Sequence, residues 1–119
     1  MKPATFGNQA AQGDLLIRRI GNIPSDAKPV QPEKGEYVVA HSETGHHHVI
    51  EARPNVRLFT TDDPMVSYLQ VVEAADKVEV LIEHLRSFDT HRAIAVLPGN
   101  YEIRRQREYS PKGWKMVAD

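Results

Sequence analysis

Short runs in which apolar and polar residues alternate cover most of this 119-residue chain. Because successive side chains of a β-strand point to opposite faces, this period of two predicts strands with one buried face. Gly, Pro, Asn and Asp separate the runs, as is typical of tight turns. The predicted strands cover residues 14–20, 37–41, 46–52, 56–61, 65–73, 77–85, 92–97 and 101–109.

The run at 77–85 bears most directly on the fold class, because Glu, Ala and Leu also favour a helix over 72–86. The apolar residues from Val78 to Ile82 share one face with His84 at a period of two, which favours a strand. About eight antiparallel strands then predict an all-β fold, either a single small barrel or a two-sheet sandwich.

The two ends of the chain differ from this pattern. Residues 1–13 are small and polar and predict a loose N-terminal arm, whereas residues 14–119 predict a single domain. Prolines are dense in residues 22–35, so this segment is expected to be a long loop. The end of the chain, residues 112–119, predicts a short irregular or helical tail with Trp114 packed on the body.

Composition narrows the class of protein. Forty per cent of the residues are hydrophobic, which suits a globular protein, and the formal net charge of −1 indicates no bulk affinity for nucleic acid or membranes. The absence of cysteine excludes disulfides and thiolate metal sites. No apolar run reaches the roughly 20 residues that span a bilayer, and the first residues lack the apolar centre of a signal peptide. A cytoplasmic location is the simplest expectation.

Histidines gather in one predicted hairpin: four of the six histidines lie within residues 41–48. A four-residue loop at 42–45 would place His41 opposite His46, and alternation adds His48 to the same face. Opposed Cβ atoms lie about 4.5–5.5 Å apart, which allows their imidazoles to share one metal ion. The alternative is a structural or solvated cluster, and alternation leaves His47 on the other face.

A second histidine pair flanks the next predicted turn, with His84 at the end of one strand and His91 at the start of the following one. Two such hairpins would deliver imidazoles to one end of the fold, where three would leave a position for water or substrate and four would close the site. With nitrogen and oxygen ligands alone, Zn²⁺, Ni²⁺, Fe²⁺ and Mn²⁺ all fit, and catalysis stays open. The predicted ligands are His41, His46, His48, His84 and His91.

Three carboxylates lie near these histidines. Glu43 and Asp89, on the two loops, could accept hydrogen bonds that orient an imidazole. Alternation points Glu51 away from the histidines, so it could ligate only across a bulge. Otherwise Glu51 is expected to pair with Arg53 or Arg57 on the surface.

Other classes of function rest on the last predicted strand and on the sheet edges. A nucleic-acid- or protein-binding surface would combine arginine with aromatic stacking, although Glu102 and Glu108 interleave and make nucleic acid the less favoured partner. An open sheet edge would suit a homo-oligomer or an assembly component of a phage-like element. The residues of the alternative surface are Arg104, Arg105, Arg107 and Tyr101.

The segment His46-x-His48-x-x-Glu51 resembles the first cupin motif, which implies a jelly-roll barrel with an internal metal. The chain departs from the second cupin motif, because no histidine follows Pro98-Gly99. Over most of its length the chain is similar to small uncharacterised bacterial proteins, some of them phage- or plasmid-borne. That resemblance rests on residues 12–17, 41–48 and 97–109 and implies a bacterial origin.

Overall fold

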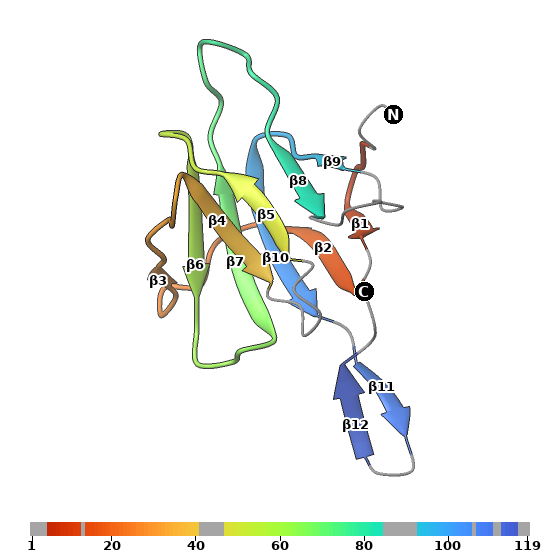
Figure 1. Ribbon diagram of the computed structural model, residues 1–119. Coiled ribbons are helices and arrows are strands. Elements are labelled where there is room, and N and C mark those ends of the chain that lie inside the picture. Colours follow the sequence, from red (N-terminus) through yellow and green to blue (C-terminus); the bar gives the residue numbers. More distant parts are fainter. Residues whose placement is uncertain are drawn as a thin grey trace.

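The computed structural model describes residues 5–12, 14–40, 47–84, 93–105, 107–110 and 113–116. Of these, Ala40, His84 and residues 107–110 and 113–116 are described by their backbone alone. The described residues form antiparallel strands and contain no helix, and hence no helix that could cross a membrane. Most strands belong to two sheets (Figure 1).

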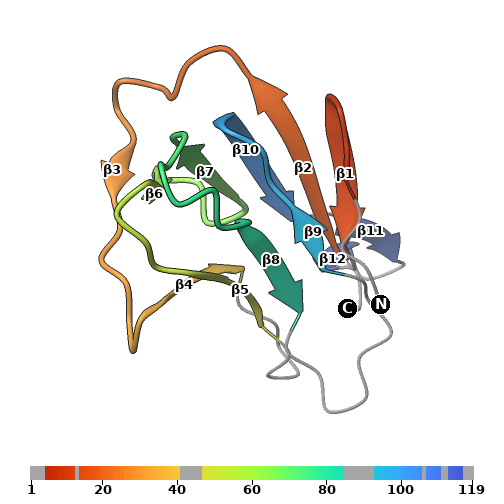
Figure 2. The same cartoon turned by 90° about the horizontal axis from the view of Figure 1, so that it is seen from above.

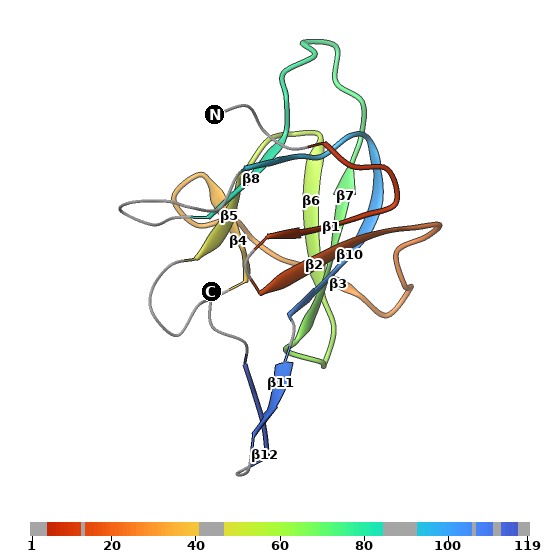
Figure 3. The same ribbon diagram turned by 90° about the vertical axis from the view of Figure 1, so that its right-hand side faces the viewer.

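The larger sheet has six strands in the spatial order β1 (Gln9–Gln12), β2 (Leu15–Ile20), β10 (Gly99–Arg105), β7 (Val66–Val71), β6 (Val56–Thr60) and β3 (Lys28–Pro29). The smaller sheet has four, in the order β4 (Glu36–Ala40), β5 (His48–Glu51), β8 (Leu81–His84) and β9 (Ile94–Ala95). A separate hairpin, β11 (Arg107–Ser110) and β12 (Gly113–Met116), extends away from both sheets (Figures 1 and 3).

The two sheets face each other and enclose the core (Figure 2). Alternation along each strand turns its apolar residues inward, so Tyr101 and Ile103 of β10 are buried while Glu102 between them faces outward. Described strands of one sheet do not pair with those of the other. The prediction of an all-β fold is therefore confirmed, and the architecture is an open sandwich rather than a closed barrel.

The strand expected over 77–85 is shorter than its alternation suggested. Only Leu81–His84 forms β8, and Val78 is 47% exposed instead of lying on the inward face. The Asp76 carboxylate accepts a hydrogen bond from the Val78 amide at 3.0 Å, and Lys77 adopts a left-handed φ of 57°. Turn formation by the acidic side chain therefore overrides the period of two at this point.

The expected N-terminal arm and C-terminal tail also contribute strands. Residues 9–12 pair with β2 and form the edge strand β1, with Gln12 3% exposed. Residues 113–116 form β12 rather than a helical turn. In both places a neighbouring strand offers unpaired backbone groups, which outweigh the weak local pattern of the segment.

The segment around residues 98–100 carries the chain from β9 in the smaller sheet to β10 in the larger sheet. Gly99 begins β10 with a φ of 154°, a conformation that favours glycine. A Cβ atom at this position would collide with the guanidinium of Arg19. That guanidinium donates hydrogen bonds to the carbonyls of Gly7 and Pro98 and to the Tyr101 hydroxyl, so it is not free to move aside.

We expect Gly99→Ala to lower the free energy of unfolding by about 1–3 kcal/mol, from backbone strain and the displaced Arg19 side chain. Gly21→Ala is the matched control, because a Cβ atom there would meet nothing within 4 Å. Urea denaturation measures both variants. Equal stabilities of the two variants would contradict the strain assigned to Gly99.

Candidate functional site

The two histidine-bearing strands are neighbours in the smaller sheet. β5 pairs with β8 in antiparallel register, and His48 lies directly opposite His84. β8 in turn pairs with β9, as predicted for the second hairpin. Within the first hairpin the expected register holds from Glu36 to Val38, after which a bulge shifts Ala40 opposite His48.

His48 is buried, with 1% of its surface exposed, and both of its ring nitrogens face oxygen atoms. Nδ1 lies 2.9 Å from Gln12 Oε1, and Nε2 lies 3.0 Å from Asp14 Oδ1. The Gln12 amide is oriented by its NH₂ group, which donates to the Ile82 carbonyl at 3.0 Å. Its oxygen must therefore accept from His48, so Nδ1 carries a proton.

The second ring nitrogen of His48 faces Asp14. Both side chains are almost fully buried, with 1% and 3% of their surfaces exposed, and the 3.0 Å between Nε2 and Oδ1 is a hydrogen-bond distance. His48 therefore joins an amide of β1 to the carboxyl group that precedes β2.

Arg105 completes this group, which we call the buried polar cluster: Gln12, Asp14, His48 and Arg105. The Arg105 Nε lies 3.5 Å from Asp14 Oδ2, and 18% of the Arg105 side chain is exposed. The two oxygens of Asp14 thus face two different basic side chains, with Oδ1 towards His48 and Oδ2 towards Arg105. The cluster lies where β1, β2, β5 and β10 approach one another inside the sandwich.

The structure places the predicted metal ligands unequally. Three of the five histidines, and both loop carboxylates, lie outside the described residues: His41, His46, His91, Glu43 and Asp89. Within the described part of the chain, no three His, Asp or Glu side chains are grouped closely enough to hold a metal ion.

Glu51 is exposed at the end of β5, as alternation required. Of the two partners predicted for it, Arg53 forms an ion pair with Asp76 at 2.6 Å, and pairing with Arg57 stays a prediction. That pair joins the segment after β5 to the turn after β7. The ion pair therefore stabilises the turn at Asp76, which shortens β8.

The alternative surface on the last strand is divided by strand alternation. Tyr101 is fully buried, and burial raises the pKa of its hydroxyl while Arg19 partly opposes this. Arg105 points inward to the buried polar cluster, whereas Arg104 points outward and donates to Glu102 at 3.1 Å. Arg107 belongs to β11 in the separate hairpin. The described side chains of Tyr101, Arg104 and Arg105 therefore do not lie on one exposed face.

Gln12 and Asp14 were not among the predicted site residues. Their signal in the sequence is a pair of polar residues, on either side of Gly13, next to an apolar strand. Such a pair resembles an ordinary turn until its partners are known. Both partners are distant, since 36 residues separate Gln12 from His48 and 34 separate Asp14 from His48.

These observations define the class: an all-β sandwich with a buried polar cluster next to its histidine-bearing strands. A family model described as domain of unknown function DUF8820 matches residues 11–106, and the chain belongs to this family. The match includes the whole buried polar cluster and ends before the β11–β12 hairpin. No curated protein and no solved structure matches the chain.

Proposed function

We propose that the end of the smaller sheet at which His48 lies opposite His84, called here the histidine end, binds one divalent metal ion. The ligands are the imidazoles of His41, His46, His84 and His91. The observation that carries this proposal is the pairing of β5 with β8, which sets His48 opposite His84. β5 begins at His48 and β8 ends at His84, so this end of the smaller sheet is where both strands meet the proposed site. His46 precedes His48 by two residues and His91 follows His84 by seven, at a reach of about 3.3–3.6 Å per residue, which supports their inclusion in the proposal.

His48 has a supporting role in this proposal. Its Nδ1 faces Gln12 and its Nε2 faces Asp14, so metal binding by His48 would have to displace one of them. The Gln12 amide is itself held by Ile82, which makes that displacement costly. His48 therefore fixes the end of β5, and the neighbouring histidines supply the ligands.

The chemistry of the ligands favours zinc as the first metal to test. Imidazole nitrogens suit Zn²⁺ as well as Ni²⁺ and Fe²⁺, and the chain has no thiolate to compete for it. Three imidazoles would leave one position for water, whose activation would make the site catalytic. Four would form a closed site that stabilises the fold.

A zinc titration followed by denaturant unfolding tests the proposal. Free Zn²⁺ at 100 to 1,000 times its dissociation constant should raise the free energy of unfolding by about 2.7–4.1 kcal/mol, and EDTA should reverse this. His46→Ala and His84→Ala should each lose most of that increase.

The matched control is His47→Ala, which removes an adjacent histidine expected on the opposite face and should keep the increase. The readout is the difference with and without zinc, so a variant that is itself less stable still gives an answer. The same increase in His46→Ala, His84→Ala and the unaltered chain would refute the proposed ligands.

A further inference from the structure

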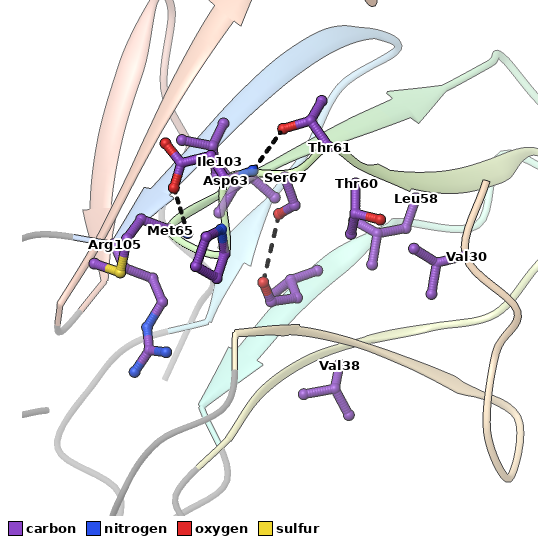
Figure 4. A pocket seen from close by; sticks show the side chains of 13 residues that line it. Val30, Val38, Leu58, Thr60, Thr61, Asp63, Met65, Ser67, Ile103 and Arg105 are labelled. Atoms are coloured by element: carbon purple, nitrogen blue, oxygen red, sulfur yellow. Dashed lines mark hydrogen bonds between the residues drawn. The ribbon is translucent and has the colours of Figure 1, made fainter. Parts of the chain in front are cut away.

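A pocket of about 240 Å³ opens between the two sheets beside the buried polar cluster. Its walls are largely apolar and come from both sheets, with Val38 from β4, Leu58 from β6 and Ile103 from β10. Figure 4 shows Arg105 at one end of the pocket, Leu58 and Val30 at the other, and Ser67 between them. The pocket is smaller than those that hold drug-sized molecules, so its ligand must be small.

Arg105 brings a positive charge to this apolar space. Its backbone amide donates to the Met65 carbonyl at 2.9 Å, which fixes the end of β10 at the pocket. Its Nε is buried and makes no hydrogen bond among the described residues, although it forms an ion pair with Asp14 Oδ2 at 3.5 Å. A guanidinium has five N–H groups, so most of the donors of Arg105 are available to a ligand.

Arg105 is the cation among the described residues that line the pocket. Asp14 is divided between two partners, with Arg105 Nε at 3.5 Å and His48 Nε2 at 3.0 Å. Asp63, an exposed residue of the wall, already accepts a hydrogen bond from the Met65 amide through Oδ1. The described lining therefore combines apolar side chains with an arginine whose Nε makes no hydrogen bond.

We propose that this pocket binds a small amphipathic carboxylate. The carboxylate group accepts hydrogen bonds from the Arg105 guanidinium, and the apolar body lies between Val38 and Ile103. Paired N–H groups of arginine match the two oxygens of a carboxylate, and burial strengthens such a contact. This site uses none of the proposed metal ligands and does not depend on a bound metal.

Calorimetric titration of the full chain with octanoate, in EDTA, tests the proposal. EDTA prevents the carboxylate from binding a metal at the histidine end, so the two proposals fail or succeed separately. Octanol supplies the same apolar body without the charge, and inorganic phosphate supplies an anion without the body. Octanoate should bind at least about tenfold more tightly than either.

Variants locate the binding. Arg105→Gln should weaken octanoate binding about tenfold or more, whereas Arg104→Gln, its neighbour on the outward face, should leave it unchanged. Val38→Trp fills the pocket while keeping Arg105, and it should abolish binding even if Arg105→Gln fails to fold. Equal binding of octanoate and octanol, or equal loss in Arg104→Gln and Arg105→Gln, would overturn the proposal.

Discussion

Replacing His48 with alanine is expected to lower the free energy of unfolding by about 3–5 kcal/mol, because it leaves a buried carboxylate without its principal partner. Asp14 has only 3% of its side chain exposed, and its second partner, Arg105, lies at 3.5 Å. The Gln12 oxygen also loses its donor, since Gln12 stays bound to Ile82. A cavity in place of the imidazole adds to the loss.

Urea denaturation of His48→Ala measures this loss, with His47→Ala as the control at an adjacent, half-buried position. The double variant with Asp14→Asn should recover part of the stability, because an amide is cheaper to bury unpaired than a carboxylate. We expect a coupling energy of about 1–3 kcal/mol between the two positions. Strictly additive losses would show that the two side chains do not interact as the structure indicates.

Tyr101→Ala is expected to lower the free energy of unfolding by a similar amount, about 3–5 kcal/mol. Its ring is fully buried in the core and meets Phe6 edge-on, with centroids 5.7 Å apart. Its hydroxyl accepts from Arg19 at 2.8 Å and donates to the Leu97 carbonyl at 2.5 Å. The side chain therefore joins the core to the crossing between the two sheets.

Tyr101→Phe separates these contributions, because it keeps the ring and should cost only about 1–3 kcal/mol for the unpaired hydrogen-bonding groups. Tyr68→Ala, at a half-exposed position on the outward face, is the control for loss of a tyrosine. Thermal or urea unfolding gives all three values. A Tyr101→Ala protein as stable as Tyr68→Ala would mean that Tyr101 is exposed, as a nucleic-acid surface would require.

Much of the fold could be predicted because its information is local. The strands at 15–20, 56–60 and 66–71 match alternating runs closely, and each run has turn residues at its ends. β8 and β9 were expected to pair because they follow one another closely in the sequence, and they do pair. The positions of these strands and the all-β class could therefore be predicted without knowing which strands pair with each other.

The parts that could not be predicted depend on distant partners or on side chains that compete with the backbone. Val78 alternates correctly with Val80, yet the Asp76 carboxylate holds the chain in a turn. Gln12 belongs to a small polar segment that has no strong pattern, and its distant partners β2, Ile82 and His48 make it a buried strand residue. The buried polar cluster joins four elements, so no single stretch of sequence identifies it.

Dependence on distant partners also explains why the candidate sites could be predicted only in part. Histidine spacing correctly indicated that His48 faces inward, but its partners proved to be an amide and a carboxylate from the edge of the other sheet. Arg104 is exposed, whereas its neighbour Arg105 reaches inward to Asp14, as strand alternation requires. That division separates the two arginines and places Arg105 at the pocket.

Elemental analysis of the purified chain is the most direct test of metal binding at the histidine end. The protein is saturated with zinc, freed of unbound ions by gel filtration, and compared with the double variant His46→Ala/His84→Ala prepared in the same way. The proposed site predicts one zinc ion per chain in the unaltered protein and a loss of that ion in the variant. Zinc at background level in the unaltered protein, or equal zinc in both, would contradict it.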